Sequence, residues 1–207
     1  MSAQLYTFLV VGISLIVFWV SFCAYFDSAK KKYQKMLKSD ITRDQMIIQE
    51  EKIRNFLDIN NLKPGTDIHE IAKHLNIVDG GVDTEQQERA KLTESMVVYF
   101  KDGESIEDQR FGFAHECGHR LDEDPVPATR QYGFNKSEME QLADYTGAAL
   151  LMPIDAVYCY LEDCQYKTLK QYKRIEKVKE LSSRYKVSKI HVIRRIQEVY
   201  LIKGNNS

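Results

Sequence analysis

The feature that most constrains this chain is the segment FGFAHECGHRLD, residues 111–122, in which His115, Glu116 and His119 form an H-E-x-x-H motif. Residues four apart lie one turn up the same face of an α-helix, so the two imidazoles can bind one metal ion. Neutral imidazole nitrogens suit Zn²⁺, and Glu116 is placed to take a proton from a metal-activated water. The alternative that these letters alone leave open is a chance match on an ordinary helix.

A zinc site of this kind needs a third protein ligand, and residues 138–144 supply candidates. Glu140 and Asp144 are four apart, so they share one face of a second helix. Glu140 can bind the metal while Asp144 accepts a hydrogen bond from a ligating imidazole. Glu138 and Asp122 are competing ligands, and two solvated carboxylates on a helix face are the ordinary alternative.

The combination of FAHECGH, E-x-x-A-D and LLMP resembles the ImmA/IrrE family of metallopeptidases, over roughly residues 68–200. The resemblance implies an α+β fold, a small zincin-like metallopeptidase domain that is mostly helical with a small sheet. It also implies a gluzincin-type site, in which His115, His119 and Glu140 bind zinc and Glu116 is the catalytic base.

The clearest strand in the sequence is a run of five apolar residues that ends before Asp102-Gly103: Met96, Val97, Val98, Tyr99 and Phe100. Earlier in the chain, Gly80-Gly81 is expected to open a loop. In zincin folds an edge strand lies beside the active-site helix. The resemblance therefore implies that the five-residue strand pairs with the substrate backbone by β-strand addition. A core strand that pairs only with its own sheet is the alternative.

Residues 5–26 contain no charged side chain, and as a helix they would be about 33 Å long, enough to cross a bilayer. A cleaved signal peptide would begin with basic residues and end at a small-residue cleavage site. Residues 1–4 contain no Lys or Arg, and no convincing cleavage site follows the apolar run. We therefore expect one uncleaved N-terminal transmembrane helix, with the lipid bilayer as its partner.

The orientation of this helix is predicted from the lysines that follow it, which are Lys30, Lys31, Lys32, Lys35 and Lys38. Basic residues next to a membrane span remain on the cytoplasmic side. We expect a single-pass protein of the cell membrane, with its N-terminus outside and residues 27–207 in the cytoplasm. The four cysteines show no disulfide spacing, and a free Cys117 beside a zinc ligand fits a reducing compartment.

The 207 residues allow one main domain with appendages. We expect a transmembrane anchor at 1–26, a juxtamembrane helical segment at 27–57 and a zincin-like core at 58–163. A basic helical segment at 164–207 is expected to pack on that core. The net charge of −1 offers no general argument for a polyanionic partner, although this last segment is itself strongly basic.

The predicted function is that of a membrane-anchored zinc metallo-endopeptidase that hydrolyses peptide bonds of a cytoplasmic protein. Known members of the ImmA/IrrE family cleave helix-turn-helix repressors, so the resemblance implies a repressor or a similar regulator as substrate. One alternative is a module that binds a regulator without cutting it. Another is a DNA-contacting regulator that uses the basic C-terminal helices, although we do not expect nucleic acid as a partner of a membrane-anchored protein.

Overall fold

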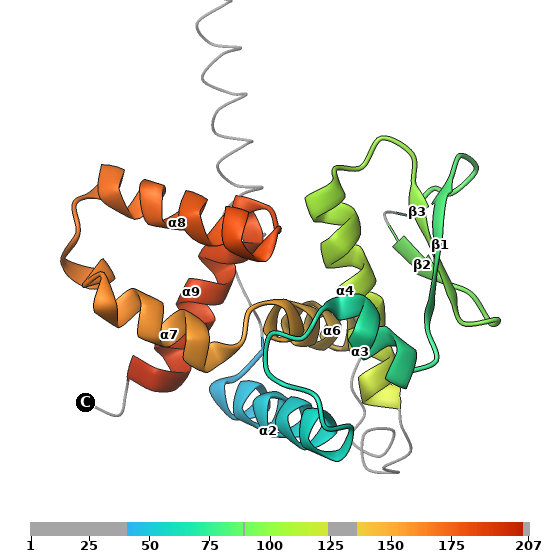
Figure 1. Cartoon of the computed structure of the whole chain (residues 1–207), viewed down its shortest axis with the longest axis horizontal. Coiled ribbons are helices and arrows are strands. Elements are labelled where there is room, and N and C mark those ends of the chain that lie inside the picture. Colours follow the sequence, from blue (N-terminus) through green and yellow to red (C-terminus); the bar gives the residue numbers. More distant parts are fainter. Residues whose placement is uncertain (1–40, 89, 124–135, 205–207) are drawn as a thin grey trace, which may run out of the picture. The chain divides into compact units, whose positions relative to one another are not determined.

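The computed structural model describes residues 41–88, 90–123 and 136–204. Contacts within the chain divide it into two units, Met1–Lys38 and Ser39–Ser207, and the described residues all belong to the second. This unit is α+β and mostly helical with one small sheet, as predicted. In chain order its elements are α2 (Arg43–Ile59), α3 (Ile68–His74), β1 (Val78–Asp83), β2 (Ala90–Leu92), β3 (Val97–Lys101), α4 (Ile106–Glu123), α6 (Lys136–Leu151), α7 (Ile154–Asp163), the 3-10 turn η1 (Tyr166–Thr168), α8 (Gln171–Tyr185) and α9 (Lys189–Lys203) (Figure 1).

Two helices begin where the local sequence supplies a capping residue. At the start of α2, the Thr42 side chain accepts a hydrogen bond from the Gln45 amide, and the Gln45 side chain accepts one from the Thr42 amide. Before α4, the Ser105 hydroxyl accepts a hydrogen bond of 3.1 Å from the Asp108 amide. Each contact satisfies amides that have no partner within the helix, so it fixes the residue at which the helix starts.

The sheet has the order β1-β3-β2, with β3 parallel to β1 and antiparallel to β2. The prediction of a strand at Met96–Phe100 is confirmed by β3, but the prediction that it pairs with substrate is wrong. A central strand already uses its backbone groups on both sides, so it has none left for an added peptide. The strand with a free edge that packs against α4 is β2.

Strand β1 runs through Gly80 and Gly81, where the sequence predicted a loop, so that prediction is wrong. A Cβ atom on Gly80 would lie 2.5 Å from Cγ1 of Val97 and 2.7 Å from Cε1 of Tyr99, both on β3. Gly81 has a φ of +78° beside an irregularity in the pairing between β1 and β3. The two glycines therefore permit close strand pairing and a bulge, which local turn statistics do not reveal.

Helices α4 and α6 approach each other closely enough for their backbones to touch. A Cβ atom on Gly118 of α4 would lie 2.8 Å from the carbonyl oxygen of Ala143 on α6. A Cβ atom on Gly147 of α6 would lie 2.8 Å from the backbone nitrogen of His115 on α4. The two helices are thus in backbone contact at two places, and only glycine fits at either.

Helix α6 lies between α4 and α9, and α2 packs against both α6 and α9 (Figure 1). Although the C-terminal segment is basic, α9 is a core helix, and its buried residues are Val192, Arg195, Ile196, Glu198, Val199 and Ile202. None of the helices within 41–88, 90–123 and 136–204 is long and apolar enough to cross a membrane. The predicted span at 5–26 lies outside these residues.

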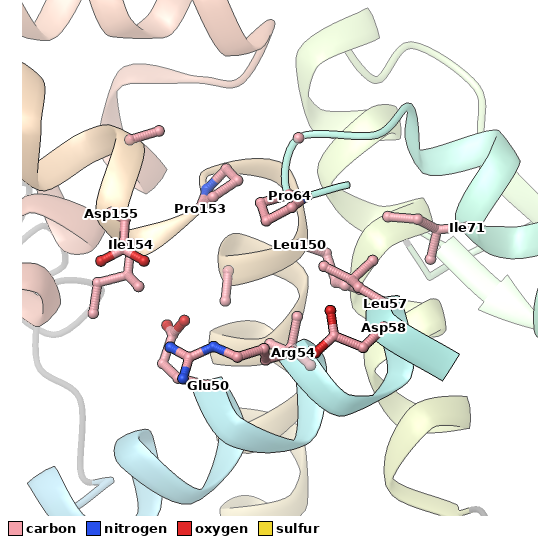
Figure 2. Close-up of a pocket in the computed structure, with 14 residues that line it drawn as sticks. Glu50, Arg54, Leu57, Asp58, Pro64, Ile71, Leu150, Pro153, Ile154 and Asp155 are labelled. Atoms are coloured by element: carbon pink, nitrogen blue, oxygen red, sulfur yellow. The ribbon is translucent and has the colours of Figure 1, made fainter. Parts of the chain in front are cut away.

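A surface pocket of about 290 Å³ opens where α2, the end of α6 and the start of α7 meet (Figure 2). Its lining includes the apolar side chains of Leu57, Ile71 and Leu150, and Glu50 and Asp155 contribute carboxylates. None of its lining residues comes from the motif segment 111–122, so the pocket is separate from the predicted active site.

We predict that Gly147→Ala lowers the free energy of unfolding by about 1–3 kcal/mol, because a methyl group there forces α6 away from α4. The expected sign opposes the intrinsic preference of helices for alanine, which is worth about 1 kcal/mol. Urea denaturation followed by circular dichroism measures the change. The control is Ser183→Ala on the exposed part of α8, expected to stay within about 0.5 kcal/mol of wild type. Equal or greater stability of Gly147→Ala would contradict the close contact.

Candidate metal centre

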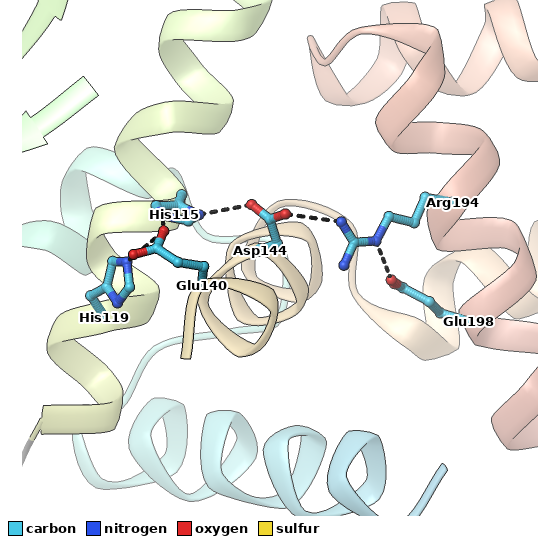
Figure 3. Close-up of polar contacts among 6 residues, drawn as sticks. All are labelled: His115, His119, Glu140, Asp144, Arg194 and Glu198. Carbon is cyan, nitrogen blue, oxygen red and sulfur yellow. Dashed lines mark hydrogen bonds and ion pairs between the residues drawn. The ribbon is translucent and has the colours of Figure 1, made fainter. Parts of the chain in front are cut away.

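Three side chains from two helices converge where α4 crosses α6 (Figure 3). Nε2 of His115 lies 3.4 Å from Oε2 of Glu140, and Nε2 of His119 lies 3.6 Å from the same oxygen. The two imidazole rings are nearly perpendicular, at 86°, with centroids 4.6 Å apart. Each residue thus offers one donor atom to a common point, and the three donors lie within 4.8 Å of one another.

The geometry of this cluster fits a zinc ion. Zinc binds nitrogen and carboxylate oxygen at about 2.0–2.2 Å, and neighbouring tetrahedral ligands are then about 3.3–3.6 Å apart. The two distances from Glu140 fall within that range. The side chains of His115 and His119 are 17% and 19% exposed, whereas Glu140 is 50% exposed, so the cluster is open on the carboxylate side. Open access leaves room for the solvent ligand that catalytic zinc sites keep.

The structure distinguishes Glu140 from the two carboxylates that the sequence left as competitors. Among the described residues, Glu140 is the carboxylate that groups with the two imidazoles, and neither Glu138 nor Asp122 belongs to that group. The Asp122 carboxylate instead forms an ion pair of 2.7 Å with Lys52 on α2. Asp122 is therefore engaged in holding the end of α4 to α2.

Asp144 lies one turn after Glu140 on α6 and contacts His115 from the other side. Its Oδ1 is 2.8 Å from Nδ1 of His115, as the sequence predicted for an orienting carboxylate. Burial alone would raise the pKa of Asp144, but the hydrogen bond and charge of His115 and the guanidinium of Arg194 lower it. Asp144 is thus a carboxylate that accepts a hydrogen bond from the N–H group at Nδ1 and leaves Nε2 of His115 able to bind a metal.

Glu116 follows His115 directly on α4 and is half-buried. Burial raises the pKa of Glu116 above its usual value, and the opposing effect of the two imidazoles does not cancel it. The backbone amide of Leu92 on β2 donates a hydrogen bond to its carboxylate. The edge strand β2 is therefore placed next to Glu116. This strand was not predicted from the sequence, because it is only three residues long.

Cys117 is fully buried on α4, and since it lies two residues from His115 and two from His119, helix geometry turns it away from the cluster. Burial raises the pKa of the Cys117 thiol to about 12, and the charge of Glu116 adds to this effect. A protonated, enclosed thiol is neither a metal ligand nor a nucleophile at neutral pH. Cys117 is thus a core residue.

Sequence analysis also missed Arg194, which reaches the site from α9. Its NH1 group lies 3.0 Å from Oδ2 of Asp144, and its Nε donates a hydrogen bond of 3.1 Å to Glu198 (Figure 3). Arg194 and Arg195 are adjacent charged residues between apolar positions of α9, after Ile193 and before Ile196, and such a pair is the one sequence signal that could have drawn attention to them.

The family model for the IrrE N-terminal-like domain matches residues 63–197, which is more than half of the chain. The chain belongs to this family. The IrrE N-terminal-like segment contains α4 and α6 completely and ends within α9, so it includes the three-residue cluster, Asp144 and Arg194. A comparison with curated protein sequences found no match.

Among solved structures, a Mycobacterium tuberculosis transcriptional regulator is similar to this chain, with a TM-score of 0.54 and 12% sequence identity. The similarity covers 80% of this chain and 51% of that chain, so this chain spans about half the length of the regulator. At this level of identity the comparison shows a shared fold. It carries no information on activity.

We predict that the purified wild-type chain contains one zinc ion per molecule, measured by plasma emission spectrometry. Glu140→Ala removes one of three protein donors and is expected to lose the zinc, because two imidazoles alone hold it weakly. Glu138→Ala, two residues earlier on α6, is the matched control and is expected to keep it. Zinc retained by Glu140→Ala and lost from Glu138→Ala would identify the other carboxylate as the ligand.

Proposed function

We propose that this chain is a zinc metallo-endopeptidase, held in the cell membrane by residues 5–26, that cleaves a cytoplasmic protein. The observation that carries the proposal is the convergence of His115, His119 and Glu140, with Glu116 beside them on α4. Membership of the IrrE N-terminal-like family supports the same reaction class. A module that only binds a regulator would have no need for a general base at position 116.

The chemistry divides between the bound metal and the side chains. When bound by His115, His119 and Glu140, zinc would supply a Lewis acid that polarises the scissile carbonyl and makes water more acidic. Glu116 accepts a proton from the attacking water and then delivers it to the leaving amine. Its raised pKa suits the first step, because a carboxylate with a higher pKa is a stronger base toward the attacking water.

We propose that the substrate backbone pairs with the edge strand β2, and not with the central strand β3. The Thr93 amide donates to the carbonyl of Val97 on β3, and amides alternate in direction along a strand. The preceding amide, that of Leu92, therefore points to the free edge of β2, where the Glu116 carboxylate accepts a hydrogen bond from it. An extended peptide added at this edge would bring its scissile bond close to Glu116.

The proposed substrate is a helix-turn-helix repressor or a similar regulator. This rests on the resemblance to the ImmA/IrrE family, since one fold can carry many functions. The DNA-contacting alternative is less well supported, because α9 packs against α6 and α7 and buries Arg195 and Glu198. A recognition helix needs a free face to enter a DNA groove.

We predict that Glu116→Gln keeps its zinc and loses cleavage, with a rate lower by about 10²–10⁴-fold, because the amide cannot accept the proton. The assay co-expresses the chain with each helix-turn-helix regulator of the source genome in turn and detects cleavage by immunoblot. Glu107→Gln, an exposed position in the first turn of the same helix, is the control and is expected to cleave normally. Full activity of Glu116→Gln would exclude Glu116 as the base.

We predict that the full chain stays with membranes through alkaline carbonate extraction, whereas a chain that begins at residue 27 is released. The physical reason is that transfer of the uncharged residues 5–26 into the hydrocarbon core lowers the free energy, and the chain that begins at residue 27 lacks this segment. Fractionation followed by immunoblot measures the distribution. Extraction of the full chain by carbonate would contradict a transmembrane anchor. Protease protection in inverted and right-side-out vesicles tests the cytoplasmic placement of the domain.

A further inference from the structure

A line of alternating charges leads from the metal cluster to helix α9 (Figure 3). Nδ1 of His115 contacts Oδ1 of Asp144 at 2.8 Å, and the other oxygen, Oδ2, contacts NH1 of Arg194 at 3.0 Å. The single Asp144 carboxylate therefore joins an imidazole to a guanidinium. The orientation of the carboxylate is set from both sides.

Arg194 is itself held in place. Its Nε donates to Oε1 of Glu198, one turn later on α9, at 3.1 Å. The side chain of Arg194 is 11% exposed and that of Glu198 is 2% exposed, so water competes little for this ion pair. A planar guanidinium that uses NH1 for one carboxylate and Nε for another has a fixed plane and direction.

Asp144 needs the Arg194 guanidinium as a second partner because its side chain is not fully buried. Its side chain is 34% exposed, so a carboxylate held only by His115 could rotate toward solvent. The Arg194 contact occupies the oxygen that would otherwise be solvated. Residues that orient metal ligands through hydrogen bonds typically change metal affinity by about 10–100-fold when they are removed.

We propose that Arg194 is a positioning residue of the metal centre, which fixes Asp144 and through it the imidazole of His115. This inference rests on the proposed zinc site. It assigns a role to α9, which lies outside the two helices that carry the cluster.

The neighbouring Arg195 has a different task. It is fully buried, donates from Nε to the carbonyl of Met152 at 2.9 Å, and pairs with Glu50 of α2 at 2.6 Å. These contacts join helices and do not reach Asp144. Arg195 therefore holds α9 against its neighbouring elements, whereas Arg194 orients Asp144. Only Arg194 is expected to affect the metal.

The test is a double-mutant cycle on zinc affinity, measured with the purified 207-residue chain by competition with a chromophoric chelator. Arg194→Met is expected to weaken zinc binding about tenfold. In the background of Asp144→Asn, the same substitution is expected to change the affinity by no more than about twofold, because its route to His115 is already lost.

The visible absorption of the Co²⁺-loaded protein gives a second readout, since it reports the ligand geometry. It is expected to differ between wild type and Arg194→Met.

The matched control is Arg43→Met. Arg43 donates from Nε and NH2 to the carbonyls of Leu201 and Ile202, so it also fastens α9 but does not contact Asp144. Its zinc affinity and Co²⁺ spectrum are expected to equal those of wild type. Glu198 would keep only its 3.6 Å ion pair with Arg195 in Arg194→Met. Where this loss prevents folding, the double variant with Glu198→Gln takes its place and is compared with Glu198→Gln alone.

Wild-type zinc affinity in folded Arg194→Met would overturn this inference and leave the proposed function intact. An equal loss of affinity with and without Asp144 would also overturn it, because the effect would then not pass through that carboxylate. Absence of zinc from the wild-type chain would overturn the inference together with the proposed function.

Discussion

The backbone contact between α4 and α6 sets the geometry of the metal cluster. The two histidines belong to α4 and the carboxylate to α6, so the distance between donor atoms is set by how closely the helices pack. Gly118 and Gly147 allow that approach, since a single methyl group at either position would meet backbone atoms at 2.8 Å. Packed interiors respond to a displaced methyl group by shifting whole elements. The metal cluster is therefore a product of helix packing, with ligands supplied by rigid elements.

A second constraint is electrostatic. Helix α9 carries Arg194, Arg195 and Glu198 into a largely apolar interior, where each charge must be paired. Consecutive residues on a helix point about 100° apart, so Arg194 and Arg195 meet different partners. Removing one member of a buried ion pair costs about 3–5 kcal/mol because it leaves the other unpaired. These ion pairs make one placement of α9 against α6 and α2 much lower in free energy than slightly shifted placements.

The sequence predicted what local geometry determines. Spacings of four residues placed His115 and His119 on one face of a helix, and Glu140 and Asp144 on one face of another, because every helix imposes the same period. The strand of β3 was equally visible from its apolar run. Its place in the centre of the sheet was not, because strand order depends on pairing with distant residues. Strand β1 was hidden because Gly80 and Gly81 read as a turn, although their lack of side chains serves the pairing with Val97 and Tyr99.

Arg194 shows the same limit at the site itself. It lies 50 residues beyond Asp144, and no local pattern connects the two. The sequence predicted that the basic segment 164–207 packs on the core, but it did not show which of its charged side chains would be buried. Burial of α9 follows from its apolar face, with Val192, Ile196 and Val199 packed inside. A charge count cannot distinguish arginines that face solvent from arginines that neutralise buried carboxylates.

The position of Arg194 in the chain has a consequence for biosynthesis. Translation proceeds from the N-terminus, and the nascent chain begins to fold before it is complete, so α4 and α6 can pair while α9 is still being made. At that stage all three cluster residues are present, but the guanidinium beside Asp144 is not. The imidazole of His115 acquires its fixed direction only when α9 docks. The candidate metal centre is therefore completed only with the last helix of the domain, although its three cluster residues are made much earlier.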